Sequence, residues 1–277
     1  MDFKSTIPSL CINDPELMTD IYVTKNKYFD KTWKYNRMFR KLVGNALVFL
    51  PSNENWMRSR KIVSQMFYKD KMAKMIPQIN LVAARHMKIW KEDKNSPDCS
   101  DFNLFHRVNK MLIDVISQCV FGFLDEELVI DEKVAEGIYV KKTIGTMTES
   151  VSNGMFKKVL SLSRIFFNCF DTMFIGQEEK ILEENIETLR GSFVKLLREK
   201  KQKIEEEQRQ GKKVEFKDML SLFVTNENYA NDEELIVDEC IEFLAAGTLT
   251  TTTLMVNLIV KSIQNPEVHR KIREDLQ

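Results

Sequence analysis

Residues 241–253 read Ile-Glu-Phe-Leu-Ala-Ala-Gly-Thr-Leu-Thr-Thr-Thr-Thr, which places a glycine and a run of threonines inside a long apolar helical pattern. Glycine costs about 1 kcal/mol relative to alanine within a helix, and β-branched residues lose χ1 freedom against the preceding turn. We expect a structural or functional gain to offset that cost. The simplest candidate is a flat or bulky group that lies against the helix at Ala246 and Gly247. The Thr250 hydroxyl would then be free to bond this group or a local carbonyl.

The helix around this stretch is predicted to be long. Its start is marked by Asn231-Asp232-Glu233-Glu234, and Asn265-Pro266 marks its end and the start of the next helix. About 33 residues at 1.5 Å each give a rod of about 50 Å. Hydropathy alone would allow a membrane span at 241–260, but Glu242, Asn257 and the threonines favour a helix buried in protein. We therefore expect no transmembrane segment in this chain.

Composition predicts one mainly α domain. The chain has 277 residues, of which 43% are hydrophobic, and only 9 are glycine and 6 proline. Few helix breakers among many Leu, Lys, Glu and Met residues favour helices over an all-β fold. Basic and acidic side chains number 41 each, and this balance gives no indication of nucleic-acid binding.

Cysteine and histidine usage excludes the common metal and redox motifs. The five cysteines, at positions 11, 99, 119, 169 and 240, are too far apart for a zinc knuckle or a CxxC pair. The three histidines show no HExxH spacing, so no histidine-based metal site is predicted. Reduced thiols in an intracellular protein are the default interpretation.

Capping signals and apolar periodicity give the remaining elements. Helices are predicted over 14–23, 54–68, 71–90, 105–121, 125–148, 178–208 and 216–225. A short strand is predicted over 8–12, and the basic residues 31–53 are predicted to form a loop. Gly122 follows the 105–121 pattern as a C-cap glycine does.

Trp56 and Arg60 form the second candidate feature. They are four residues apart in a predicted helix and are therefore neighbours on one face. The indole N–H and the guanidinium are both donors only, so the pair suits an anionic ligand that carries carboxylates. Stacking of an exposed tryptophan on an arginine is the structural alternative.

Taken together and in this order, these elements resemble the cytochrome P450 family of haem-thiolate monooxygenases. Asp14-Pro15-Glu16-Leu17 resembles an early helix of that family, and Trp56-x-x-x-Arg60 resembles the helix that holds a haem propionate. The end of the 105–121 pattern, Cys-Val-Phe-Gly, is similar to the central core helix, and 246–251 to the oxygen-binding groove of the long distal helix. The resemblance spans nearly all 277 residues in register. It implies a mainly α, P450-like fold that stops after the long helix and the start of the next.

The resemblance also implies roles for individual residues. Trp56 and Arg60 would bond a propionate of the cofactor, haem b. Ala246 and Gly247 would face the haem plane, and Thr250, with Thr251 beside it, would steer protons to bound dioxygen. A small-residue patch where another helix crosses is the structural alternative for Ala246 and Gly247.

Two departures from the family pattern matter. Leu249 stands where the family usually has an acid, so we expect proton delivery to rely on Thr250 and water, and oxygen activation to be slower or leakier. The Glu-x-x-Arg helix and the cysteine loop that ligates the iron are also missing. We therefore expect residues 1–277 to be a single partial P450 domain, the N-terminal part of such an enzyme. It would contain no iron ligand and would be inactive alone.

The implied partners are a small apolar organic substrate, dioxygen, and an NADPH-dependent reductase or ferredoxin-type electron donor. Residues 155–174, with Phe166 and Phe167, combine an apolar face with basic edges at 157, 158 and 164. Contact with a membrane surface, as at the endoplasmic reticulum, and ordinary core packing both explain this stretch. A rival function is that of a haem-free helical homologue that acts as an interaction or structural protein.

Overall fold

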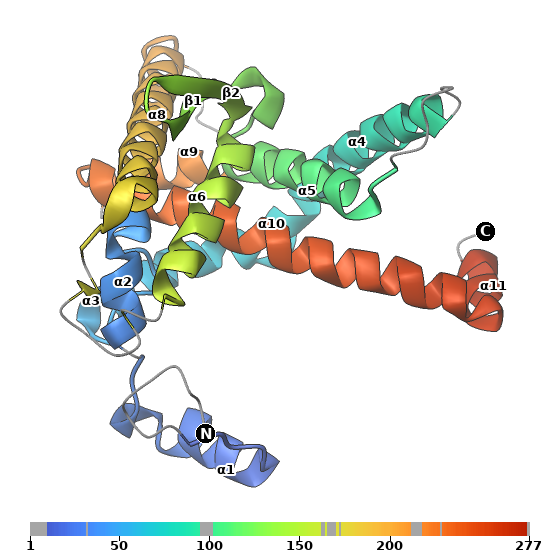
Figure 1. The fold of residues 1–277 in the computed structure, drawn as a ribbon, viewed down its shortest axis with the longest axis horizontal. Helices are drawn as coiled ribbons and strands as arrows, with labels where there is room; N and C mark the ends of the chain where they lie inside the picture. The colour runs from blue at the N-terminus through green and yellow to red at the C-terminus, as the bar shows by residue number, and fades with distance from the viewer. Residues whose placement is uncertain are drawn as a thin grey trace.

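The computed structural model describes residues 10–31, 33–94, 102–161, 164, 170–171, 173–211, 218–227 and 229–275. It confirms the mainly α prediction, with one two-stranded antiparallel sheet among the described residues (Figure 1). The helices of four residues or more are α1 Pro15–Thr19, the π-helix η1 Asp20–Thr24, α2 Trp33–Val43, α3 Glu54–Ser64, α4 Lys69–Lys94, α5 Leu104–Val120, α6 Ile144–Val159, α8 Gly176–Arg209, α9 Met219–Thr225, α10 Glu233–Gln264 and α11 Pro266–Asp275. Short 3-10 turns are η2 Asn26–Tyr28, η3 Gln65–Phe67 and η5 Asp125–Glu127, and the strands are β1 Val129–Ala135 and β2 Ile138–Thr143.

The helix ends follow the capping signals in the sequence. The Asp14 carboxylate accepts the N–H of Glu16 at 2.8 Å, and Asp232 accepts the N–H of Leu235 at 2.9 Å. Each cap satisfies donors that have no partner within the helix. Gly122 has φ 82°, which ends α5 with the left-handed residue expected after a helix.

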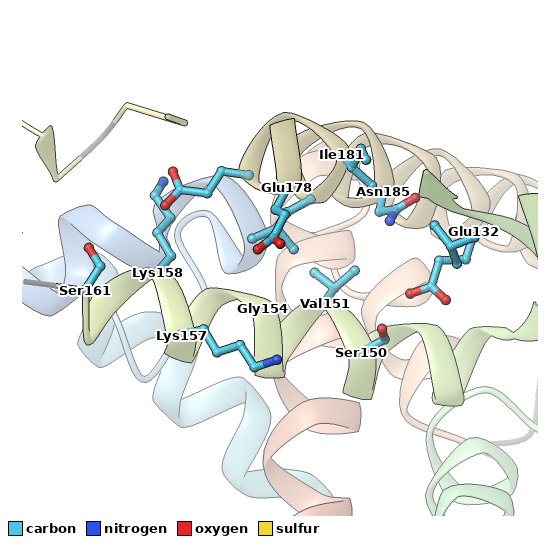
Figure 2. Close-up of a pocket in the computed structure, with 13 residues that line it drawn as sticks. Glu132, Ser150, Val151, Gly154, Lys157, Lys158, Ser161, Glu178, Ile181 and Asn185 are labelled. Atoms are coloured by element: carbon cyan, nitrogen blue, oxygen red, sulfur yellow. The ribbon is translucent and has the colours of Figure 1, made fainter. Parts of the chain in front are cut away.

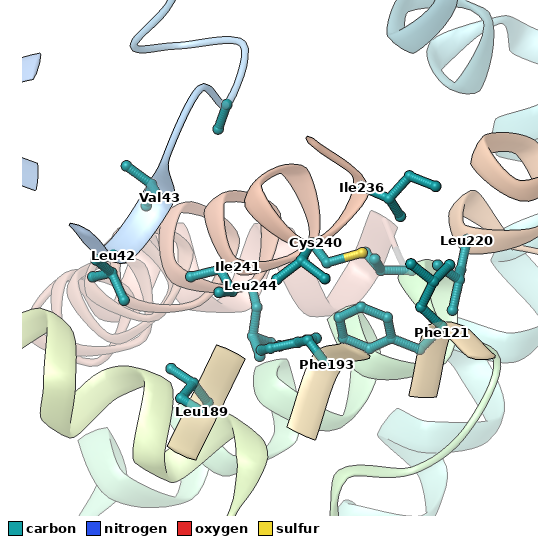
Figure 3. Packing of buried hydrophobic residues seen from close by; sticks show 14 of the residues in the cluster. Leu42, Val43, Phe121, Leu189, Phe193, Leu220, Ile236, Cys240, Ile241 and Leu244 are labelled. Atoms are coloured by element: carbon teal, nitrogen blue, oxygen red, sulfur yellow. The ribbon is translucent and has the colours of Figure 1, made fainter. Parts of the chain in front are cut away.

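The core lies around the N-terminal half of α10. Figure 3 shows its buried side chains packed between those of α2, α8 and α9 and the end of α5. The buried residues at this junction include Leu42, Leu189, Phe193, Leu220, Ile236, Cys240, Ile241 and Leu244. Because α10 is apolar on several sides here, helices surround it, and its position fixes the rest of the fold.

Residues 125–148 do not form the predicted helix. They contain η5, the β1–β2 hairpin with Gly137 at φ 71° in its turn, and only the first residues of α6. The hairpin is fixed to α8 by Asn185, whose amide accepts the Lys133 N–H at 2.8 Å and donates to the Lys133 carbonyl at 2.9 Å. This tertiary contact, together with the glycine turn, overrides the local helical pattern.

The predicted loop at 31–53 is also wrong in its first half, where α2 forms. Met38, Phe39, Leu42 and Val43 are buried in the core, and their spacing is that of an amphipathic helix. Residues 10–12 form no strand, and the rest of the predicted strand lies outside the described residues.

The C-terminal half of α10 extends away from the body of the molecule toward α11 (Figure 1). Leu254, Leu258 and Ile263 are all exposed there. Burial of the long helix in protein is therefore confirmed for its first half only. Among the described residues, α10 is the one helix that is long and apolar enough to be a candidate membrane span. The core helices of soluble proteins also meet these two criteria.

Candidate functional site

Trp56 and Arg60 lie on one face of α3, as their spacing predicts. Asn53 caps the helix by accepting the Trp56 N–H at 3.1 Å, which sets where the first turn begins. The Arg60 guanidinium carbon lies 4.9 Å from the centroid of the Trp56 ring. Arg60 is exposed and Trp56 half-buried, so the stacked pair keeps a guanidinium edge open to an anion.

Lys31 joins this pair from the segment before α2. Its ammonium lies 5.2 Å from the Trp56 ring centroid and donates to the carbonyls of Leu47 and Leu50, both at 2.9 Å. Burial lowers the pKa of Lys31, and the nearby Glu242 carboxylate acts against that change. Two cations, Lys31 and Arg60, therefore flank the Trp56 indole. The sequence pattern did not identify Lys31 as part of this site.

The second half of the candidate site lies on α10. Ala246 and Thr250 are exposed, one turn apart, and the Thr250 hydroxyl donates to the Ala246 carbonyl at 2.7 Å. Gly247 is half-buried and turned toward α5, where an added Cβ would lie 3.0 Å from Cδ1 of Ile116. The missing side chain at 247 thus lets α5 approach closely, the structural role weighed for this glycine.

The threonines of α10 divide between two faces. Thr248 and Thr252 are buried, and the Thr252 hydroxyl donates to the Asn109 side chain on α5 at 3.0 Å and to the Thr248 carbonyl at 2.9 Å. Thr250 and Thr253 are exposed on the other side, and Thr251 is half-buried between them. The threonine run therefore fixes α10 on α5 with one face and leaves small hydroxyls on the opposite face.

The two halves of the candidate site belong to elements that pack together. The ring of Phe67, in η3 directly after α3, lies 6.3 Å from the ring of Phe243 on α10, one turn before Gly247. Lys31 interacts electrostatically with both Arg60 and Glu242. The end of α3 is thus joined to α10 by an aromatic contact, and Lys31 links Arg60 electrostatically to the buried Glu242 one turn before Ala246.

Buried acids on α10 are a feature that sequence reasoning missed. Asp238, Glu239 and Glu242 are 3%, 0% and 7% exposed. Burial, reinforced by the Glu242 charge, raises the pKa of Glu239 to about 8, and burial raises the pKa of Glu242 to about 7. Tyr229, whose pKa is raised chiefly by its burial, donates from its hydroxyl to Glu239 at 3.2 Å. Their spacing on one helix was visible in the sequence, but their burial was not.

The described cysteines do not supply an iron ligand at this face. Cys240 is buried in the core, Cys119 is half-buried on α5, and Cys11 is exposed near α1. Burial raises the pKa of both the Cys119 and the Cys240 thiol. Cys99 and Cys169 lie outside the described residues.

A polar pocket of about 530 Å³ lies apart from this site, between α6, α8 and β1. Figure 2 shows Glu178 and Asn185 projecting from α8 toward α6, with Lys157 on α6 and with Glu132, on β1, near Asn185. None of the six candidate residues lines this pocket.

Part of the stretch expected to touch a membrane lies beside this pocket. Lys158 and Arg164, expected at its basic edge, are 3% and 1% exposed, and Arg164 forms an ion pair with Glu179 at 2.6 Å. Phe166 and Phe167 lie outside the described residues. These two basic groups are therefore buried in the fold and do not form an exposed basic edge.

Nearly the whole chain is similar to known proteins of one family. A family model described as cytochrome P450 matches residues 3–277. The chain is 23% identical over 268 residues to "Cytochrome P450 734A1" of Arabidopsis thaliana, covering 96% of this chain and 47% of that protein. It is 23% identical to "11-oxo-beta-amyrin 30-oxidase" of Medicago truncatula, covering 99% and 49%, and 23% identical to "Putative cytochrome P450 CYP13A1" of Caenorhabditis elegans, covering 99% and 55%. The chain therefore spans about half the length of the curated relatives it matches.

Proposed function

Because the chain belongs to the cytochrome P450 family, we propose that it is the distal, mostly helical part of a haem-thiolate monooxygenase. The complete enzyme inserts one atom of dioxygen into a small apolar organic substrate, with electrons from an NADPH-dependent reductase or a ferredoxin-type donor. Residues 1–277 form a single partial domain. The observation that carries this proposal is the contact between Phe67, directly after the Trp56–Arg60 helix, and Phe243, one turn before Gly247 on α10.

The residues at this face fit a haem on its distal side. The Arg60 guanidinium and the Trp56 indole N–H are both donors only and suit a propionate. The small side chain of Ala246 leaves room for a flat ring. Gly247 adds room by letting α10 settle closely on α5. When bound, the haem supplies the activation of dioxygen, which no side chain performs.

The chain itself contributes positioning and proton transfer. In this structure the Thr250 hydroxyl donates to the Ala246 carbonyl. If the hydroxyl rotated, it would pass a proton from solvent water to a ligand at the open face of α10, with Thr251 beside it. Leu249 offers no carboxyl to this route. Because no described cysteine faces the site, this chain alone does not turn over substrate.

A reduced-plus-carbon-monoxide difference spectrum tests the proposal, on this chain and on the longest product of its gene. We expect a thiolate-type Soret band in the long product alone. Arg60→Leu should lower its haem content, whereas Arg58→Leu, an exposed arginine on the same helix, should leave it unchanged. No haem signal in the long product, or equal loss in both variants, would contradict the proposal.

Thr250 has a matched control in Thr253. Both are exposed, and the Thr253 hydroxyl also donates to the carbonyl four residues earlier, at 2.9 Å. In the long product, Thr250→Ala should raise hydrogen peroxide release per substrate oxidised, and Thr253→Ala should not. Leu249→Asp should lower peroxide release below the parent. Tight coupling in the parent would contradict the role assigned to Leu249.

A haem-free helical homologue is the second candidate function, and Leu249 in place of an acid is the observation that favours it. Such a protein would show no carbon-monoxide spectrum in any product of the gene. It would still fold and melt cooperatively without haem, since its core does not use the α10 face at 246–250.

Contact of 155–174 with a membrane surface stays part of the proposal for the complete enzyme, at the endoplasmic reticulum. Phe156, Leu160 and Met173 are exposed there, and Lys157 is also exposed. Phe156→Asp should then reduce flotation of the protein with anionic vesicles. Unchanged flotation would assign these side chains to packing.

A further inference from the structure

The linking segment, residues 44–53, connects α2 to α3 and runs along the N-terminal half of α10. Two acids of α10 each accept a backbone N–H from it. Asp238 accepts from Asn45 at 2.7 Å, and both oxygens of Glu242 lie 3.2 Å from the Val48 nitrogen. Backbone donors of an irregular segment are thus satisfied by one helix instead of by water.

The opposite side of the linking segment is held by Asp30 and Lys31. Lys31 donates to the carbonyls of Leu47 and Leu50, and Asp30 accepts the Ser52 N–H at 3.1 Å and the Ser52 hydroxyl at 2.8 Å. These bonds join positions far apart in the chain. The segment is therefore fixed from two sides by charged groups.

Gly44 shows how closely the linking segment approaches α10. Its φ is 50°, and an added Cβ would overlap the Asp238 carboxylate. Asp238 is also paired with Arg190 at 2.7 Å, and Arg190 donates to the Leu42 carbonyl at 2.9 Å. The entrance to the segment is thus fixed on α8 and α10 together.

The far end of the linking segment sets the start of α3. Asn53 is its last residue and caps α3 through the Trp56 N–H, and Arg60 follows one turn later. We propose that Glu242 and Lys31 are positioning residues for Trp56 and Arg60: through the linking segment they fix where α3 begins and how it is rotated, and so hold both side chains beside the Lys31 ammonium. This inference rests on the proposed function, which makes Trp56 and Arg60 haem contacts.

The charges around Glu242 suit this role. Lys31 is the cation that faces it from the segment before α2, and Asp238, Glu239 and Tyr229 are its titratable neighbours. Glu242 therefore sits between one cation and a group of acids. Removing its side chain leaves the Val48 N–H without this acceptor and Lys31 without its facing charge.

Two measurements on the 277-residue chain without haem test the positioning. One is amide hydrogen exchange of Asn45 and Val48, with α5 amides as the internal reference. The other is the Trp56 emission spectrum in a Trp33→Phe, Trp90→Phe background. Because the Val48 N–H loses its carboxylate acceptor, we expect about tenfold or more loss of protection at Val48 in Glu242→Ala. A shift in Trp56 emission should accompany it.

Conservative and control variants separate positioning from general damage. Glu242→Gln keeps an acceptor and should restore most of the Val48 protection. Glu234→Ala, an exposed glutamate on the same helix, should change neither readout. If Glu242→Ala also loses α5 protection, Lys31→Met decides, since it removes the two hydrogen bonds to the segment and keeps an aliphatic side chain at this position.

The outcomes distinguish this inference from the proposed function. Unchanged Val48 exchange and unchanged Trp56 emission in Glu242→Ala would overturn the positioning role. If Glu242→Ala also loses α5 protection, the same result in Lys31→Met would overturn it. Neither readout involves haem. A failed carbon-monoxide spectrum with altered exchange and emission would instead reject the haem function and leave the role of Glu242 and Lys31 in place.

Discussion

Raising the pH should destabilise this protein across the neutral range, because two carboxyls are buried on α10. Burial raises the pKa of Glu242 from 4.5 to about 7 and that of Glu239 from 4.5 to about 8. Between those values the folded state binds more protons than the unfolded state. Their contribution is therefore fully present below about pH 4.5 and is lost as pH rises through 7 and 8.

The size of the effect follows from linkage. A pKa difference between 4.5 and about 7 corresponds to about 3 kcal/mol for Glu242 alone. Glu239 adds to this without being fully additive, since the Glu242 charge is one cause of its raised pKa. Lys158, whose pKa is lowered to about 8, acts in the opposite direction above that pH, so the window ends there.

Urea unfolding at several pH values from about 5 to about 8 measures the slope. The free energy of unfolding should fall by about 3 kcal/mol or more across the window, and Glu242→Gln should remove much of that fall. Glu234→Gln is the matched control, because it removes an exposed charge from the same helix. Stability that rises with pH, or a Glu242→Gln slope equal to that of the parent, would refute the assignment of buried, protonated acids.

Three further predictions concern packing. Gly44→Ala should lower the free energy of unfolding by about 2 kcal/mol or more, because the added Cβ would overlap the Asp238 carboxylate. Gly247→Ala should change it by less than about 1 kcal/mol, because only the flexible end of the Ile116 side chain is close. Urea melts compare the two variants, and equal costs would contradict this prediction. Asn185→Leu should cost about 2 kcal/mol and selectively raise amide exchange in β1, and β1 exchange unchanged from the parent would argue against its role. Leu254→Gln with Leu258→Gln should reduce self-association in light scattering without lowering stability, and unchanged scattering would show that this face does not drive association.

Local signals in the sequence were sufficient for most of the helices. Asp14, Asn53 and Asp232 cap helices where short polar side chains precede an apolar pattern, and Gly122 ends α5. These features depend on neighbours within a few residues. For the same reason the spacing of Trp56 and Arg60 correctly placed both side chains on one helical face.

Tertiary contacts decided the regions where prediction failed. The β1–β2 hairpin depends on Asn185, which lies more than forty residues away in the chain. No pattern of neighbouring residues predicts a contact over that distance. In contrast, α2 carried a visible signal in Met38, Phe39, Leu42 and Val43, which the abundance of basic residues obscured. Basic composition describes the solvent face of such a helix and does not argue against the helix itself.

The chemistry of the candidate site was predictable only in part, because it depends on burial. Ala246 and Thr250 were expected to face a ligand, and both are exposed on one side of α10. Nothing in the sequence distinguishes exposed Glu234 from buried Glu239 and Glu242. That difference arises from the linking segment, which covers one stretch of the helix and not the other.

The burial of α10 explains why its small residues occur where they do. From Ile236 to Leu244 every residue of the helix except the half-buried Phe243 is buried, and the Asn45 and Val48 N–H groups donate to Asp238 and Glu242, which fixes the helix to the linking segment. After Leu244, Thr252 still anchors one face to α5 through Asn109, while the other face is exposed from Ala246 onward. Residues 246–251 thus form the first stretch of the helix that is both immobilised and open. A helix held in this way can present the Thr250 hydroxyl and the small Ala246 side chain to a ligand at low reorganisation cost. Glycine and threonine there therefore follow from the architecture of α10 as well as from the chemistry proposed for it.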